Sequence, residues 1–224
     1  MATETAGADL VVFGAEALQL AELLCARLCH DIAGPLGALI GSLDLASEAD
    51  GDLAEEAIGM ARETGRSLIS RLRLLRAAWA GNGTELDLAS LAELAQGLPR
   101  PRLLLDVSAL SPTTVFDPKV GRVVLNLVLL AAEALPAGGT IRLDRAEDDL
   151  LVGVSGRRSA WPAGLGAALA GRVSFESPRE LQAPFTVALA RAAGLGLSIL
   201  MPTGPQPPEA PLLVLGLFGR RTSP

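Results

Sequence analysis

The chain contains a single histidine, His30, within the stretch LCARLCHDIAGPLGALIG at residues 24–41. The unperturbed pKa of a histidine side chain is about 6.5, so a neutral imidazole nitrogen is available as a nucleophile near neutral pH. Imidazole is also a common metal ligand, and a lone histidine can equally be a helix residue whose hydrogen bonds are satisfied locally. Three roles are therefore open for His30: nucleophile, metal ligand or structural residue.

Two cysteines, Cys25 and Cys29, lie close to the histidine. In a helix they are one turn apart, which is too close to join distant parts of a fold by a disulfide. Cys29 and His30 point in different directions around a helix, and the sequence offers no second cluster of metal ligands. We expect no metal site, and two reduced thiols that act as small buried residues beside the core of a helical bundle.

Composition limits the class of protein. The 224 residues are 50% hydrophobic, enough to bury a large core in one large domain or two ordinary ones. The formal net charge is −6 and Lys119 is the only lysine, which argues against a broad nucleic-acid interface. The N-terminus opens with acidic residues, and the apolar stretch VVLNLVLLAAEAL is interrupted by Asn126 and Glu133 before it reaches the roughly 20 residues of a membrane span. We expect a cytoplasmic protein with no membrane span and no nucleic-acid partner.

His30 lies in a helical pattern that runs from about Glu16 to Ala80. The first run ends near Ser47, a turn follows at residues 48–51, and a second run with apolar residues three and four positions apart begins near Asp52. Two helices alone leave an apolar stripe uncovered, and a second copy of the same hairpin is the nearest surface that can cover it. The pattern predicts an antiparallel hairpin that pairs into a dimeric four-helix bundle.

The helix face that carries His30 differs from the apolar face. At about 100° per residue, His30 lies roughly 240° from Leu24, whereas the apolar residues fall within a sector of roughly 120°. The apolar face is formed by Leu24, Leu28, Ile32, Leu36, Leu39 and Leu43, and the histidine face by Gly34, Gly37 and Gly41. A glycine inside a helix costs about 1 kcal/mol relative to alanine, so three on one face indicate a surface on which another molecule docks closely. Tight packing of one helix against another is the alternative role for these glycines. A bend of the helix at Pro35 would also change which residues share a face.

Residues 81–83 mark the boundary between two predicted domains, 1–82 and 83–224. Beyond it the pattern changes from long helices to short strands and helices, which is typical of an α/β sandwich. Asp87 and Asp117 are predicted to cap helices. The predicted helices are 87–96, 118–135, 163–169 and 178–193. The predicted strands lie within 102–110, 140–147 and 150–156, and a turn at 148–149 joins the last two. A final hairpin of two strands is predicted around the proline-rich TGPQPPEA.

The run His30-Asp31-Ile32-Ala33-Gly34-Pro35 resembles the phosphoacceptor box of histidine-kinase dimerisation domains, in which an acidic residue follows the histidine and proline lies five positions on. Its setting, LCHDIAGPLGALIGSLDL, and the later VVLNLVLLAAEALPAGGTIRL resemble the dimeric histidine phosphotransferases of the ChpT type, so that the resemblance spans most of residues 15–218. It implies a dimeric four-helix bundle that relays phosphate, followed by a degenerate histidine-kinase ATPase-like α/β domain that helps to bind partners.

The resemblance also implies roles for particular residues. His30 is the phosphoacceptor, which attacks the aspartyl phosphate of a receiver domain, and Asp31 orients or stabilises its imidazole. A solvated or partner-facing charge is the alternative for Asp31, because adjacent residues of a helix point about 100° apart. The receiver would bring the magnesium ion and its own cationic side chain. The residues expected to contact the partner are Arg27, Gly34, Gly37 and Gly41.

An ATP site is not expected in the second domain. Kinases use polar side chains one helical turn apart to coordinate magnesium and phosphates, but here Asn126 is followed four residues on by Leu130. Ser155 stands where kinases carry the aspartate that reads the adenine amino group, and the lid that would follow is too short. Residues 194–197 match the kinase GLGL string, but they follow a predicted helix instead of opening one, which indicates a turn into a strand.

The sequence therefore predicts a cytoplasmic, homodimeric histidine phosphotransferase that relays phosphoryl groups between receiver-domain aspartates through phosphohistidine at His30, with no cofactor of its own. The expected partners are the receiver domain of a hybrid histidine kinase and the receiver domains of response regulators. A genuine ATP-dependent histidine kinase and a non-catalytic scaffold for response regulators are the alternatives.

Overall fold

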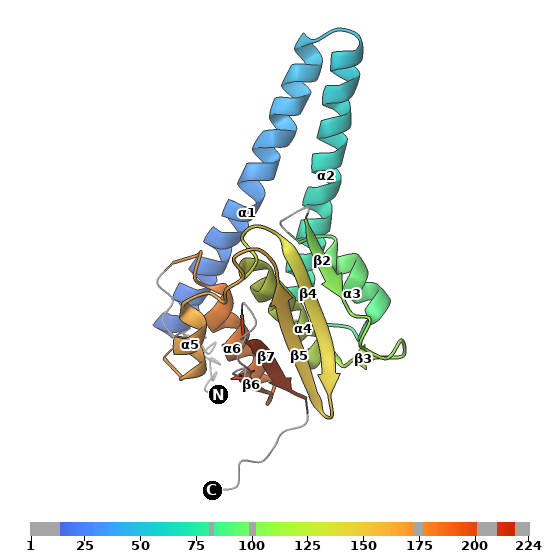
Figure 1. The fold of residues 1–224 in the computed structure, drawn as a ribbon. Helices are drawn as coiled ribbons and strands as arrows, with labels where there is room; N and C mark the ends of the chain where they lie inside the picture. Colours follow the sequence, from blue (N-terminus) through green and yellow to red (C-terminus); the bar gives the residue numbers. More distant parts are fainter. Residues whose placement is uncertain (1–13, 81–82, 99–101, 173–176, 201–209, 218–224) are drawn as a thin grey trace, which may run out of the picture.

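A computed structural model of the chain describes residues 14–80, 83–98, 102–172, 177–200 and 210–217. The predicted hairpin is present as α1 (Ala15–Glu48) and α2 (Asp52–Trp79), and it projects from the α/β part of the molecule (Figure 1). Gly51 has a φ of +60°, a left-handed conformation that glycine adopts without strain, and it lets the chain reverse between the two helices.

The α/β part is built on a five-stranded sheet with the order β2-β4-β5-β7-β6. β2 and β4 pair in parallel and the other neighbours are antiparallel, while β1 (Leu86–Asp87) and β3 (Val115–Phe116) form a separate ribbon. The sheet strands are β2 (Leu103–Asp106), β4 (Gly139–Ala146), β5 (Asp149–Ser155), β6 (Gly196–Leu200) and β7 (Leu212–Gly216). The helices are α3 (Leu88–Ala95), α4 (Pro118–Glu133), α5 (Gly164–Leu169) and α6 (Gln182–Ala192). This architecture confirms the predicted fold class of an N-terminal helical hairpin followed by an α/β domain.

α4 is the central helix of the α/β part. The Asp117 carboxylate accepts hydrogen bonds from the backbone N–H groups of Lys119 and Val120, and Pro118 occupies the first turn, as the sequence predicted. Nearly every residue from 121 to 132 is buried, because α4 packs against the sheet, α2 and α6. Its apolar side chains share the core with the inward-facing strand residues Ile141, Leu143, Leu150, Val152, Leu213 and Leu215.

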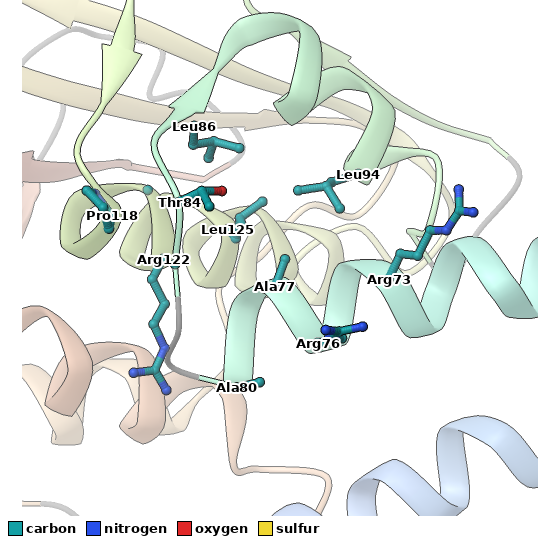
Figure 2. Close-up of a pocket in the computed structure, with 12 residues that line it drawn as sticks. Arg73, Arg76, Ala77, Ala80, Thr84, Leu86, Leu94, Pro118, Arg122 and Leu125 are labelled. Carbon is teal, nitrogen blue, oxygen red and sulfur yellow. The ribbon is translucent and has the colours of Figure 1, made fainter.

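The hairpin and the α/β part share one hydrophobic core, because the last two turns of α2 pack in the same cluster as α4. The Arg122 guanidinium of α4 donates to the carbonyl oxygens of Ala78 (3.1 Å) and Trp79 (2.7 Å), which the end of α2 leaves without helical partners. A cavity of about 350 Å³ lies beside this junction. Figure 2 shows Arg122 and Leu125 of α4 among the residues that line it. The end of α2 is therefore fixed on α4.

Two predicted features differ in detail, and one feature was not predicted. The helix expected from Pro178 begins at Gln182, because residues 178–180 form a turn. The turn between β4 and β5 lies at Glu147 and Asp148, one residue earlier than predicted. The ribbon of β1 and β3 was not predicted, because two-residue strands carry no hydrophobic period. Within the proline-rich stretch TGPQPPEA, residues 203–209 lie outside the described residues.

The hairpin exposes large apolar side chains in a single chain. Leu36, Ile40 and Leu43 of α1 are 43%, 51% and 50% exposed, and Leu53 and Met60 of α2 are similarly open. No membrane span was predicted, but by length and apolar composition residues 17–48 could form a helix that crosses a membrane. The same composition suits a helix that another protein chain covers, so it is weak evidence for a span.

Candidate functional site

His30 lies on α1 near the α/β part, with a side chain that is 65% exposed. Its Nδ1 atom is 3.5 Å from Oδ1 of Asp31, longer than a strong hydrogen bond but close enough for the carboxylate to act on the imidazole. The structure therefore brings together the two residues that the sequence singled out for phosphoryl chemistry, and it leaves the imidazole accessible.

Asp31 is enclosed by two guanidinium groups, and its side chain is only 12% exposed. Its Oδ1 atom accepts a hydrogen bond from Arg27 Nε at 3.1 Å, and its Oδ2 atom accepts one from Arg71 Nη2 at 2.6 Å. Such charge-assisted bonds are short and strong. Asp31 is thus a fixed, partly buried anion and not a solvated surface charge.

Arg27 joins this carboxylate to the α/β part. Its Nη2 atom donates to Oε1 of Glu133 at 2.8 Å, and its Nη1 atom donates to the carbonyl oxygen of Pro178 at 3.1 Å. Arg27 was expected to contact a partner protein. Its side chain is only 16% exposed, however, because its guanidinium mostly contacts residues of its own chain. The base of α1 is held against α4 and the segment before α6.

The electrostatics of these groups follow from burial and pairing. Burial alone would raise the pKa of Asp31, but the hydrogen bond from Arg71 and the charges of Arg27 and Arg71 lower it below its ordinary value. Burial raises the pKa of Glu133 despite the opposing charge of Arg27. Burial would lower the pKa of Arg27, but Glu133 and Asp31 raise it. Asp31 is therefore the more firmly ionised of the two carboxylates.

The predicted docking residues Gly34, Gly37 and Gly41 are all exposed on α1. A Cβ atom added at any of them would meet no atom within 4 Å. Packing of these glycines against α2 of the same chain is therefore contradicted, whereas a second copy or a different protein could still approach them. Cys25 and Cys29 are also exposed in the single chain, and their predicted burial beside the core of a dimeric bundle stays a prediction. Within the described residues no group of three His, Cys, Asp or Glu side chains could hold a metal ion.

The positions compared with a kinase nucleotide site serve the core of this chain. Asn126 is fully buried, and its amide donates to the carbonyl oxygens of Ala78 (2.8 Å) and Arg122 (2.9 Å). Its Oδ1 atom accepts from Gln182 Nε2 at 3.1 Å. Leu130 is buried among core side chains. The GLGL string follows α6, as predicted, with Gly194 at φ +75° and the last two residues in β6.

Sequence reasoning missed Arg71 and Glu133. Arg71 stands among the apolar positions of α2, between Leu68 and Leu75, and only 8% of it is exposed. A buried charge on an apolar face requires a partner, and that signal could have identified it. Glu133 was noted only as an interruption of an apolar run, and nothing local in the sequence linked it to Arg27.

Comparison with known proteins shows the family of this chain. The family described as the histidine phosphotransferase C-terminal domain matches residues 89–203. The protein phosphotransferase ChpT of Brucella abortus (strain 2308) is 31% identical over 195 residues, which cover 82% of this chain and 90% of the relative. A solved structure of a bacterial phosphotransferase superposes with a TM-score of 0.69 at 24% identity, covering 92% of this chain and 97% of that one, and shows the same fold.

The matched family and the 31% identical relative show that the chain is a histidine phosphotransferase. The chain belongs to the ChpT-type family of these phosphorelay proteins, whose activity entails interaction with receiver domains of response regulators.

Proposed function

We propose that the chain relays phosphoryl groups between receiver-domain aspartates through phosphohistidine at His30. The observation that carries this proposal is the exposed imidazole of the only histidine in the chain, which lies beside the fixed carboxylate of Asp31. An exposed nucleophile suits a protein whose substrate is another protein, since the receiver must bring its phosphoaspartate to the imidazole.

The geometry supports a simple mechanism. Because Nδ1 faces Oδ1 of Asp31, the neutral imidazole holds its proton on Nδ1 and keeps the lone pair of Nε2 free. Nε2 attacks the phosphorus, the N–P bond forms, the P–O bond to the receiver aspartate breaks, and the aspartate leaves as a carboxylate. The ring then carries positive charge, which the Asp31 carboxylate stabilises. Transfer to a second receiver reverses these steps, and the receivers supply Mg²⁺ and a cationic side chain.

The proposal includes a homodimer. The apolar side chains left open on the hairpin include Leu36, Ile40 and Leu43 on α1 and Met60 and Ile69 on α2, and a second hairpin would remove them from water. The exposed face of α1 at Gly34, Gly37 and Gly41 is then available for docking of the receiver. Arg27 lies at the edge of this face and acts on the site by its hydrogen bond to Asp31.

We further propose that the chain binds no ATP and works in the cytoplasm, with the receiver of a hybrid histidine kinase and those of response regulators as partners. Support for the first point comes from Asn126 and Leu130, because the hydrogen bonds of Asn126 are used within the core and Leu130 offers no metal ligand. These contacts argue against a role for either residue in coordinating magnesium and phosphates.

Incubation of the purified chain with labelled ATP and Mg²⁺ tests the proposal against its rivals. The relay predicts no labelling from ATP and labelling of His30 from a phosphorylated receiver. Labelling of His30 from ATP alone would establish a kinase instead. If signalling in cells survives His30→Ala, the chain is a scaffold.

A further inference from the structure

Four charged side chains from three helices form one partly buried cluster beside His30. Arg27 and Asp31 come from α1, Arg71 from α2 and Glu133 from α4, with side chains that are 16%, 12%, 9% and 22% exposed. We call this cluster the three-helix ion network. It contains two positive and two negative groups, and its Asp31 oxygen is the nearest recorded charge to the imidazole.

The network fixes the orientation of the Asp31 carboxylate. Arg27 holds one carboxylate oxygen and Arg71 holds the other, so rotation of the carboxylate would break a charge-assisted bond on each side. Arg27 is itself fixed by Glu133 and by the carbonyl oxygen of Pro178. The direction in which Oδ1 faces His30 is therefore set by residues of α2 and α4 as well as α1.

The imidazole needs such an external constraint. It is 65% exposed, and its contact with Asp31 at 3.5 Å is the one interaction recorded for it in the described part of the chain. Free histidine in water favours the tautomer with its proton on Nε2, the nitrogen that must be unprotonated to attack. A carboxylate held at Nδ1 favours the other tautomer, and a displacement of about 1 Å at a reacting group can lower a rate roughly a hundredfold.

We propose that Arg71 and Glu133 are positioning residues for phosphotransfer at His30. Arg71 acts directly on Asp31, and Glu133 acts through Arg27. Together they hold Oδ1 of Asp31 toward Nδ1 of the imidazole, so that Nε2 is the unprotonated nitrogen and points outward. This inference rests on the proposed function and extends it, because the α/β part then supports the chemistry in addition to any role in partner binding.

The chemistry of the network also suits reversible transfer. Two guanidinium groups make Asp31 a weak base, so it stabilises the charged ring without removing the Nδ1 proton. The phosphoimidazole thus keeps its positive charge and remains a good phosphoryl donor to the next aspartate. The charged groups that face this site are Arg27 and Asp31 from α1, Arg71 from α2 and Glu133 from α4.

The single histidine allows a direct test on the full chain. Labelling with ¹⁵N-histidine gives one imidazole, whose ¹⁵N shifts report which nitrogen carries the proton. Phosphoramidate serves as a small donor that needs no receiver: its P–N bond breaks, ammonia leaves and the N–P bond to His30 forms. The variants are Arg71→Met, Arg71→Lys and Glu133→Gln, and the matched control is Arg73→Met, whose side chain on the same helix is 67% exposed.

We expect the Nδ1–H tautomer and Nε2 phosphorylation in the wild type. Arg71→Met should shift the imidazole toward the Nε2–H tautomer and slow labelling roughly tenfold. Arg71→Lys should recover part of both effects, Glu133→Gln should show a smaller shift, and Arg73→Met should match the wild type. If Arg71→Met fails to fold, Glu133→Gln, which keeps an acceptor for Arg27, decides the question.

An Nε2–H tautomer in the wild type, or unchanged tautomer and labelling rate in the folded variants, would overturn the positioning role. Labelling of the wild type by phosphoramidate without onward transfer to any receiver would instead overturn the relay and leave the positioning result standing. The two failures are therefore distinguishable.

Discussion

The side-chain amide of Asn126 on α4 donates a hydrogen bond to the carbonyl oxygen of Ala78 at the end of α2 across 2.8 Å. The residue that most resembles part of a kinase nucleotide site therefore joins the hairpin to the α/β part. Gln182 of α6 donates to the same asparagine, so three helices meet at one buried amide.

Asn126→Ala should lower the free energy of unfolding by about 1–3 kcal/mol, because Gln182 loses a buried acceptor and one donor to Ala78 disappears. Urea unfolding measures this change. Ser155→Ala provides the control, since Ser155 is exposed and should be close to neutral. Equal stability of the two variants would show that the buried amide does not hold the helices together.

Gly37→Leu should leave the melting temperature unchanged or slightly higher, because a helical glycine is replaced and no atom lies within 4 Å of the added Cβ. Transfer from a phosphorylated receiver should fall sharply, because the leucine would project into the docking surface. Thermal unfolding and transfer rate are measured on one sample. A lower melting temperature with loss of the dimer would show that the glycine packs against a second copy.

Leu43→Lys combined with Leu72→Lys should convert the dimer to a folded monomer, because these side chains are 50% and 38% exposed in one chain. Leu28 is a poorer choice, since it packs against the core of its own chain. Sedimentation velocity and circular dichroism measure the two properties. Leu104→Lys, on the exposed side of β2, should have no effect on assembly. Sedimentation of the unmodified chain as a stable monomer at micromolar concentration would refute the bundle.

The stability that Asp31 provides should depend on pH. Its pKa is lowered in the folded chain, so its contribution is present above its ordinary pKa of 3.8 and is lost as pH falls through the lower folded value. The difference in unfolding free energy between the wild type and Asp31→Asn should shrink as the pH falls below about 4.

Glu133→Gln should show the opposite trend, because the folded chain raises the pKa of Glu133 and favours its protonated form. Relative to this variant, the wild type should lose stability as the pH rises through the raised pKa. Differences that are flat with pH for both variants would contradict the burial and pairing described for the network.

The sequence predicted correctly those elements whose signals lie within a few neighbouring residues, such as apolar spacing and helix caps. The spacing of apolar residues predicted the hairpin. Asp87 and Asp117 were predicted to cap two helices, and both side chains accept hydrogen bonds from the first turn of those helices in the structure. Arg71 and Glu133 were missed because their partners lie 40 and 106 residues away in the chain. Cys25 and Cys29 are exposed in one chain, and a helical wheel places residues on faces but does not show which face a second chain covers.

The central claim is that phosphate passes through His30 from one receiver to another. The most direct measurement follows labelled phosphate from a phosphorylated receiver domain, through the full chain with Mg²⁺, to a second unphosphorylated receiver. The relay predicts transient label on the wild-type chain at His30 and its appearance on the second receiver, with both lost in His30→Ala. Transfer between the receivers that is equally fast with His30→Ala, or label on the chain at any other residue, would contradict it.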